Sequence, residues 1–221
     1  MEVQDAIKGR YSCRAYLDKP VARETISQIL DTARCAPSST NMQPWQVAVV
    51  QGETLKRMGE QMIAARQEGD KEKPDYDYYP YEWFEPYRSR RKATGLALYK
   101  ALGIGKDQPD ARMQAWCNNY LLFGAPVGVL VFLDGRLAEG SLADIGIFVQ
   151  NLVLTARDQG LDSCIQASLG EYPDIVRELL GLEPEMTLFC GVALGYGDPE
   201  AAVNQFRTPR AAVEEFTRWY D

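Results

Sequence analysis

The chain has 221 residues, a formal net charge of −7 and no histidine. Its length is sufficient for one domain with a real core, and its apolar and charged fractions, 46% and 25%, are those of an ordinary globular protein. The lack of histidine excludes Ser-His-Asp and Cys-His catalysis and every histidine-bearing metal site, so an enzyme of this composition must use carboxylates, Lys, Tyr, Ser or a cofactor.

The charge balance and the cysteine pattern exclude several further classes. With 24 basic and 31 acidic residues, a nucleic-acid-binding face would have to overcome the overall field, and we expect no nucleic-acid partner. The one basic cluster, residues 88–92, is interpreted as a solvated face or a local anion contact. The five cysteines include no Cys-x-x-Cys pair, which argues against a disulfide framework, a zinc ribbon or a thioredoxin-type motif. We expect no metal.

The sequence shows no signal for export or for a membrane. Its N-terminus carries acidic residues at once and has no apolar core of signal-peptide length. No stretch approaches the ~18 apolar residues of a membrane-spanning helix. A cytoplasmic protein with no membrane partner is therefore expected.

The first third of the chain predicts three helices and a strand. Residues 2–9 predict a short helix that Gly9 ends, and residues 22–35 predict a longer one after Pro20. The longer helix has apolar residues at amphipathic spacing: Ile26, Ile29, Leu30 and Ala33. A strand is expected over Trp45–Val50, followed by a helix marked by Leu55, Met58, Met62 and Ile63.

Residues 68–112 differ in character from the rest. A polar stretch is followed, between residues 75 and 87, by five Tyr, one Trp and one Phe. This segment is too aromatic for a disordered linker, so it predicts an elaborated loop or lid with helical pieces, and a helix is expected over residues 111–122. The aromatic cluster either covers a substrate or forms a satellite core under the loop, and the sequence leaves both open.

The second half alternates strands and helices. Val127–Leu133 is nearly continuously apolar, as in a central strand. The helix expected over residues 141–159 is apolar on more than one face and therefore predicts a core or interface helix. The remaining expected elements are a strand or extended loop at 162–168, a helix at 175–180, a strand at 187–194 and a Pro-interrupted tail at 199–221. No Gly-x-Gly-x-x-Gly follows a strand, so no dinucleotide-binding fold is expected.

Two motifs near the N-terminus carry the chemistry. Arg10-Tyr11-Ser12-Cys13-Arg14 sets two guanidinium groups and a hydroxyl around a turn, which suits a phosphate monoester. Ala36–Trp45 is a helix exit of small, hydrogen-bonding residues whose backbone can lie close to a flat polar ring. Together with Gly124-Ala125-Pro126, Asp144, residues 160–164, residues 191–198 and Arg210, in this order and spacing, the chain resembles the FMN-dependent nitroreductase family.

The resemblance implies a fold. It is α+β, with a central mixed but mostly antiparallel sheet surrounded by helices, in an intertwined homodimer whose two subunits share each cofactor site. Residues 1–221 would form a single domain, with 68–112 as a lid or insert and 199–221 as a C-terminal tail that embraces the partner subunit. The apolar end of the tail, Phe216 to Tyr220, fits such a role because it would otherwise lie in water.

The resemblance also implies a cofactor site. Arg10, Ser12 and Arg210 would hold the FMN phosphate, and Arg14 would lie near the N1 and O2 edge of the flavin. A fixed cation there stabilises the negative charge that two-electron reduction places on that edge. A segment of the partner subunit would lie along the ring and would consist of Pro37, Ser38, Ser39 and Asn41. The N5 region of the flavin would be contacted by Ile165, Gln166 and Ala167. Asn119 would lie at the pyrimidine edge.

The implied activity is an NAD(P)H oxidoreductase with a ping-pong hydride mechanism. NADH or NADPH would reduce FMN at N5, and an aromatic acceptor would then reoxidise it, with no catalytic side chain required. Nitroaromatic compounds, reduced to the nitroso and hydroxylamino stages, are the leading acceptors, and quinones are a further class. Four aromatic residues of the lid are expected to stack on this acceptor: Tyr76, Tyr81, Trp83 and Phe84.

Two alternatives stay open. One is a relative that removes halogen from halogenated tyrosine or phenols, which grips the amino acid through a Glu, a Tyr and a Lys of its lid. Glu82, Glu85, Tyr87 and Lys92 are available here, although their spacing does not align. The other is a non-catalytic flavin-binding or interaction protein whose aromatic loop docks a partner.

Overall fold

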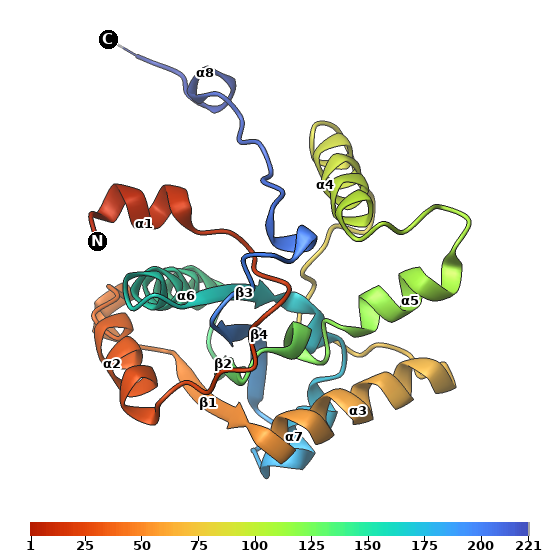
Figure 1. The fold of residues 1–221 in the computed structure, drawn as a ribbon. Coiled ribbons are helices and arrows are strands. Elements are labelled where there is room, and N and C mark those ends of the chain that lie inside the picture. The colour runs from red at the N-terminus through yellow and green to blue at the C-terminus, as the bar shows by residue number, and fades with distance from the viewer. Residues whose placement is uncertain (221) are drawn as a thin grey trace.

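The computed structural model describes residues 1–220 as a four-stranded sheet with helices on both faces (Figure 1). The strands are β1 (Gln46–Gln51), β2 (Val127–Asp134), β3 (Asp162–Gln166) and β4 (Met186–Gly195). The α-helices are α1 (Val3–Gly9), α2 (Arg23–Ala33), α3 (Gly52–Glu68), α4 (Tyr87–Ala101), α5 (Pro109–Cys117), α6 (Gly140–Asp158), α7 (Pro173–Leu180) and α8 (Val213–Phe216). Single 3-10 turns are η1 (Ser39–Asn41), η2 (Leu122–Gly124), η3 (Ala167–Glu171) and η4 (Ala202–Asn204).

The sheet has the strand order β1-β2-β4-β3, and each neighbouring pair in it is antiparallel. A parallel bridge between Ser12 and Ser163 adds the N-terminal segment beside β3. The α+β class expected from the sequence, with a mostly antiparallel sheet, is confirmed.

Strand β2 shows why the sheet occupies the centre. Seven of its eight residues are buried, as the continuous apolar run predicts. Its odd-numbered residues, from Val127 to Leu133, pack into the core on one face of the sheet, while Leu130 and Phe132 pack into the core on the other. The strand period of two therefore supplies both cores from one apolar segment.

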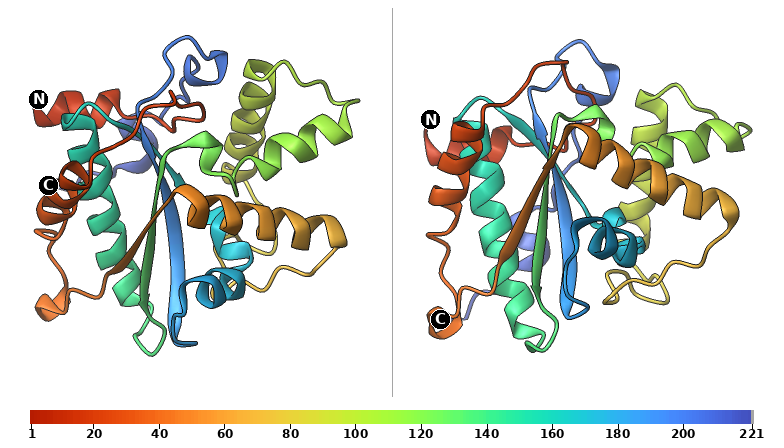
Figure 2. Two further views of the ribbon diagram at one scale, coloured as in Figure 1. Left: turned by 60° about the horizontal axis from the view of Figure 1, so that its bottom comes forward. Right: turned by 90° about the horizontal axis from the view of Figure 1, so that it is seen from below.

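The helices form two layers around the sheet (Figure 2). Helices α2 and α6 pack on one face, with α1 beside α6, and α3 and α7 cover the opposite face. The apolar stripe expected along residues 141–159 is buried on the first face: Ile145, Phe148, Val149, Leu152, Val153 and Ala156. Trp45, at the start of β1, stacks on Phe148 with 5.1 Å between ring centroids, as a structural residue would.

The 68–112 insert is more helical than its sequence indicates. It contains helix α4, of 15 residues, which extends from the side of the sheet together with α5 (Figure 1). The helix expected over 111–122 begins at Pro109 and ends at Cys117, after which Leu122 and Phe123 adopt left-handed φ values of 51° and 56°. Left-handed residues cannot continue a right-handed helix, so the chain turns here toward β2.

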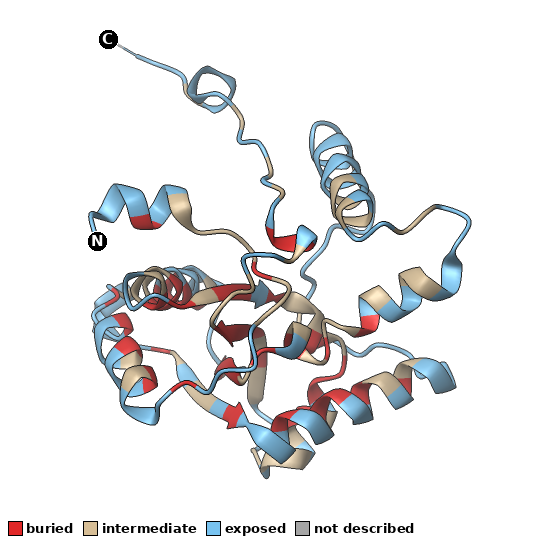
Figure 3. Cartoon of the chain, in the orientation of Figure 1, coloured by how far each residue is buried: buried red, intermediate tan, exposed pale blue. Residues whose placement is uncertain are grey.

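Buried residues are concentrated at the sheet and the helices that pack on it, whereas the segments with α4 and α8 are exposed (Figure 3). Neither α4 nor α8 contains a buried residue. Within residues 1–220, no helix is long and apolar enough to cross a membrane.

Candidate functional site

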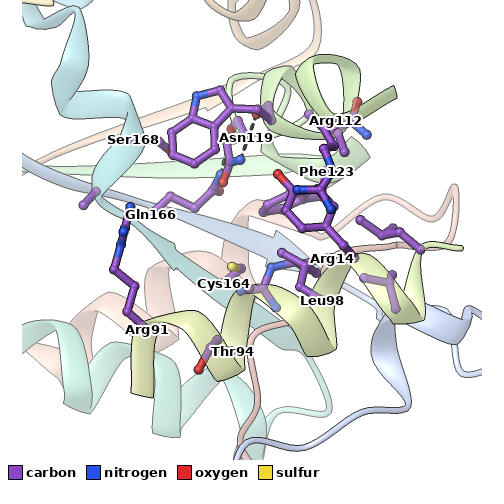
Figure 4. A pocket seen from close by; sticks show the side chains of 18 of the residues that line it. Arg14, Arg91, Thr94, Leu98, Arg112, Asn119, Phe123, Cys164, Gln166 and Ser168 are labelled. Carbon is purple, nitrogen blue, oxygen red and sulfur yellow. Dashed lines mark hydrogen bonds between the residues drawn. The ribbon is translucent and has the colours of Figure 1, made fainter. Parts of the chain in front are cut away.

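A cavity with a volume of about 710 Å³ lies where the C-terminal end of β3 meets helices α4 and α5 and the η2 turn. Its walls combine flat aromatic rings with cations and amides (Figure 4). Five residues expected from the sequence to contact the cofactor line it: Arg14, Asn119, Ile165, Gln166 and Ala167. The cavity therefore joins parts of the chain that are more than 100 positions apart, as the family resemblance implies.

The N-terminal motif reaches the cavity because β3 holds it. Beside the Ser12–Ser163 bridge, the Cys13 amide donates to the Ser163 carbonyl at 3.0 Å. The next amide, that of Arg14, donates to Oδ1 of Asn204 at 2.8 Å. Residues 12–14 are thus fixed between the sheet edge and the η4 turn.

The Arg14 guanidinium is held over the cavity without an acidic partner. Its Nη1 donates to the Ser12 carbonyl at 3.3 Å, and its central carbon lies 5.9 Å from the Phe123 ring and 6.0 Å from the Phe206 ring. No ion pair among residues 1–220 involves Arg14. An oriented, unneutralised cation of this kind stabilises negative charge on a ligand beside it.

Arg10 and Arg210 come together next to this loop, although neither lines the cavity. Burial, and then the positive charge of Arg210, lower the pKa of Arg10. Arg210 is exposed and uses its Nη1 for bonds to Thr208 and the Pro209 carbonyl. The two guanidinium groups are close enough to repel each other, and neither forms an ion pair with a carboxylate among residues 1–220. Such a pair of cations is suited to binding a phosphate.

The wall formed by β3 and η3 contains two buried polar atoms without partners. Gln166 donates from Nε2 to the Asn119 carbonyl at 2.7 Å, but its Oε1 has no donor, and Oγ of Ser168 is also unpaired. Each such atom costs about 1–3 kcal/mol if it stays unsatisfied. The pyrimidine edge of a flavin offers an N–H donor flanked by two carbonyl acceptors, so the residues present fit that group.

Cys164 lies in the same wall, and its thiol is poorly reactive. Burial raises the pKa of its thiol to about 11, against the opposing effects of Arg14, the Ser12 hydroxyl and Arg10. The thiolate, which is the nucleophilic form, is therefore scarce at neutral pH. This agrees with an expected chemistry that uses no catalytic side chain.

The segment with Pro37, Ser38, Ser39 and Asn41 does not line this cavity. The Ser39 amide donates to Oδ2 of the largely buried Asp144 at 3.1 Å, and Oγ of Ser38 accepts from the Gln43 amide at 2.9 Å. Within it Thr40 and Asn41 have φ values of 48° and 58°. Such backbone is strained for a β-branched residue and is held where function requires it. The expectation that the segment serves a partner subunit's cofactor stays a prediction.

The four aromatic residues expected to touch an acceptor lie apart from the main cavity. Tyr81 is 93% exposed, Phe84 is exposed, and Trp83 packs against Tyr79 with the two rings tilted by 45°, while none of the three lines the cavity. The Tyr76 hydroxyl donates to the Phe189 carbonyl at 2.6 Å. Phe189 is the extra residue where β4 shifts register against β2, so Tyr76 anchors the insert to the sheet. Their role with a substrate stays a prediction.

Tyr76 does line a second, smaller cavity of about 220 Å³, which shares Tyr79, Trp116, Ala167 and Ser168 with the large one. Tyr79 and Trp116 line both cavities. Tyr79 belongs to the aromatic lid expected from the sequence, although it is not among the four residues expected to touch the acceptor, and Trp116 lies outside that lid. Only the fold distinguishes which rings face inward.

The cations of helix α4 are the largest group that the sequence did not assign. Arg88, Arg91 and Lys92 line the cavity, and Arg112 joins them from α5. Arg88, Arg91 and Lys92 belong to the basic cluster over residues 88–92, which is interpreted from the sequence as a solvated face or a local anion contact and is not assigned to the cofactor site. In residues 1–220 no group of three or more Cys, Asp or Glu side chains is arranged to hold a metal ion.

The fold and the site together define an α+β protein with an oriented arginine, a phosphate-type clamp and an aromatic cavity. The family model described as the nitroreductase family matches residues 7–196. The chain belongs to the nitroreductase family, and the family and fold expected from the sequence are confirmed.

The chain is similar to nitroreductases over nearly its whole length. It is 34% identical to the 4-nitrobenzoate reductase of Pseudomonas putida over 213 aligned residues. The alignment covers 96% of this chain and 93% of that protein. It matches the crystal structure of the FMN and NADPH-dependent nitroreductase NfnB from sphigopyxis sp. strain HMH with a TM-score of 0.95 and 37% identity over 100% of both chains. The FMN-dependent nitroreductase NfnB from Mycobacterium smegmatis, in complex with NADPH, gives a TM-score of 0.94 and 36% identity over 99% of this chain and 97% of that one.

A dehalogenase is a more distant relative. The iodotyrosine dehalogenase 1 homolog of Caenorhabditis elegans is 25% identical over 224 residues, which is 98% of this chain and 60% of that protein.

Proposed function

We propose that this protein is an FMN-dependent NAD(P)H oxidoreductase that reduces nitroaromatic compounds. The observation that carries the proposal is the convergence of Arg14, the β3 end and an aromatic cavity beside the Arg10–Arg210 pair. FMN, when bound, supplies the redox chemistry by accepting electrons from a nicotinamide and passing them to an acceptor. The named relatives agree with this activity.

The residues of the chain would hold the cofactor at both ends. Arg10 and Arg210, with Ser12, would bind the phosphate, and Gln166 and Ser168, which line the cavity and carry unpaired polar atoms, would bond to the ring. Arg14 stabilises negative charge at the ring edge from a position fixed by Asn204 and Ser12. The cavity of about 710 Å³ is lined by the flat rings of Tyr79, Trp116 and Phe123, which suit a planar aromatic ligand.

The rest of the assignment concerns the surroundings of the enzyme. A homodimer is proposed because the apolar tail is exposed at Phe216, Trp219 and Tyr220, and because the family resemblance assigns residues 37–41 to the cofactor site of a partner subunit. A cytoplasmic location follows the cysteine pattern, since four of the five thiols are buried and all five are free. Quinones are a second acceptor class with the same flat shape.

The dehalogenase alternative loses support from the lid. Lys92 lines the cavity, but Glu82, Glu85 and Tyr87 do not. Glu85 instead accepts a hydrogen bond from the Ser89 amide at 3.3 Å, next to the start of α4. Without a carboxylate in the cavity wall, the ammonium group of an amino-acid substrate has no counter-ion there.

The test is to identify the cofactor and the products. The purified protein is denatured, the released flavin is chromatographed, and steady-state rates are measured with varied NADPH and nitrobenzene. FMN, parallel double-reciprocal lines and a hydroxylamino product are expected. FAD or no flavin, or a protein that carries FMN and turns over no nitroarene, would contradict the proposal, and the latter result would support the non-catalytic alternative.

A further inference from the structure

The main cavity has a charge pattern opposite to that of the whole chain. Its wall contains five cationic side chains, Arg14, Arg88, Arg91, Lys92 and Arg112, and no Asp or Glu. The complete chain has 31 acidic residues and 24 basic ones. None of the five forms an ion pair with a carboxylate among residues 1–220. A concave wall with one sign of charge concentrates a ligand of the opposite sign.

The α4 cations come from one face of the helix. Arg88, Arg91, Lys92, Gly95 and Tyr99 follow the i, i+3, i+4 spacing and all line the cavity. Arg90, on the other face, pairs with Glu215 at 3.3 Å and does not line it. Figure 4 shows Arg91 extending from α4 and Arg14 and Arg112 at the same cavity from other elements.

The position of these cations works against the stability of α4. Cations near a helix N-terminus are unfavourable because they add to the positive end of the helix dipole. The first turn of α4 has no acidic residue, whereas α2, α3, α5 and α7 each have one: Glu24, Glu53, Asp110 and Asp174. The Glu85 carboxylate, which accepts from the Ser89 amide, offsets part of this charge at the start of α4, and a bound anion would offset more of it.

The neighbouring groups restrict what the anion is attached to. Arg91 lies 4.9 Å from the Trp83 ring, and Arg112 lies 4.1 Å from the Tyr99 ring, so these guanidinium groups are held on aromatic faces. Tyr79, Trp116 and Phe123 add flat apolar surface to the same wall. A single aromatic ring that carries a carboxylate matches both features over a short span. In an extended NADPH, by contrast, the 2′-phosphate lies far from the nicotinamide.

We propose that the α4 cations, chiefly Arg91 and Lys92, make this enzyme selective for nitroaromatic acceptors that carry a negative charge, of the nitrobenzoate class. The proposal rests on the function proposed above and names its substrate class. The cations bind and orient the carboxylate end, which leaves the nitro group free to face the cofactor. They are specificity residues and take no part in electron transfer.

The test compares two acceptors of equal shape, 4-nitrobenzoate and its neutral amide, 4-nitrobenzamide. The holoenzyme is reduced anaerobically with NADPH, and its reoxidation is followed by stopped flow with each acceptor. The amide is the more electron-poor nitroarene, so a pocket without charge selectivity favours it. We expect kcat/KM to favour the carboxylate by about ten-fold, the effect of one charge-assisted hydrogen bond. The preference falls as salt is added, because the site is open to solvent.

Variants assign the preference to the helix. Arg91→Gln and Lys92→Gln should each remove most of it, and Arg91→Lys should keep it because the charge remains. Arg90→Gln is the matched control, since it removes a cation of the same helix outside the cavity, and it should leave the ratio unchanged. An unchanged ratio in both cavity variants would overturn the proposal.

Two other outcomes are distinguishable. If Arg91→Gln and Lys92→Gln slow reduction by NADPH but not by NADH, and leave the acceptor ratio unchanged, the cations hold the donor's phosphate and the proposal is wrong. If neither nitroarene reoxidises the reduced holoenzyme, the proposed function itself fails. If the wild-type enzyme reduces both acceptors but favours the amide at low salt, only the selectivity proposal fails.

Discussion

Arg14 has the properties of an electrostatic residue whose position is set before any ligand binds. Its backbone is held by Asn204, and its guanidinium by the Ser12 carbonyl and two aromatic rings. A charge held in this way does not reorganise when negative charge develops beside it. The proposed phosphate site is separate from Arg14, since it consists of Arg10 and Arg210.

This separation gives a prediction for Arg14. Replacing Arg14 with Ala should destabilise the reduced flavin more than it weakens flavin binding. The flavin reduction potential should fall by on the order of 30 mV for each 1.4 kcal/mol of stabilisation that the two-electron reduced form loses. Arg14→Lys should restore part of the potential. A spectroelectrochemical titration measures it, and an Arg14→Ala enzyme with the wild-type potential would remove Arg14 from the ring edge.

A second prediction concerns Arg210. The Arg210→Ala variant should retain FMN less tightly by about 2 kcal/mol, the scale of one charge-assisted hydrogen bond. Its neighbour Arg207 provides the control, because its guanidinium lies 4.0 Å from the Tyr11 ring and bonds to the Asn204 carbonyl. Flavin dissociation constants from fluorescence titration of the apoprotein decide the matter, and equal losses in both variants would argue against a specific clamp.

The site residues also show what a sequence can reveal. Arg14, Gln166 and Ala167 come from ordered motifs, and the fold brings them to one cavity, while Arg10 of the same motif as Arg14 lies outside it, near Arg210. Tyr81 and Phe84 were chosen for being aromatic, but they lie outside the cavity, while Tyr79 from the same run lines it. Side-chain direction in an irregular segment follows from long-range contacts such as the Tyr76–Phe189 bond, which no local pattern encodes.

At the element scale, the two regular layers were predictable and the insert was not. β2 is a continuous apolar run and α6 carries a long apolar stripe, because the strand is buried on both faces and the helix is buried against the sheet. Helix α4 lacks such a stripe because it has no buried residue, so its sequence gives no amphipathic signal. Its charged face is explained by the cavity instead of the core.

The contact between α3 and the turn after α5 gives a test of packing at this scale. A Cβ added to Gly59 would lie 2.7 Å from the Tyr120 carbonyl oxygen, which is backbone and cannot easily move. Gly59→Ala should therefore destabilise the protein by about 1–3 kcal/mol. Gly95→Ala, in α4, meets nothing within 4 Å and should be neutral or stabilising by up to about 1 kcal/mol. Urea unfolding curves of the two variants compare them, and a Gly59→Ala protein as stable as the Gly95→Ala protein would contradict this packing.

At the scale of the whole molecule, the exposed apolar tail calls for a partner. Phe216, Trp219 and Tyr220 are 70%, 82% and 85% exposed. An exposed cluster of three large apolar side chains in one extension is typical of a surface that contacts a partner. A second copy of the chain is the partner that the family resemblance implies.

Deletion of residues 212–221 should thus weaken the dimer, whose interface is expected to exceed ~2,000 Å². The truncated protein should dissociate or aggregate and lose flavin, because the family resemblance implies that both subunits contribute to each site. Arg218→Ala, a change of an exposed polar residue within the tail, should leave the assembly intact. Sedimentation velocity distinguishes these outcomes, and a truncated protein that is dimeric with full flavin content would show that the tail is dispensable.

The central claim, that this cavity holds FMN and passes electrons from a nicotinamide to a nitroarene, is tested most directly by an anaerobic titration of the purified protein. One equivalent of NADPH per bound FMN should bleach the flavin absorbance, and added nitroarene should restore it while nitroso and hydroxylamino products form. A flavin that NADPH does not bleach, or a bleached flavin that the nitroarene leaves reduced, would contradict the account.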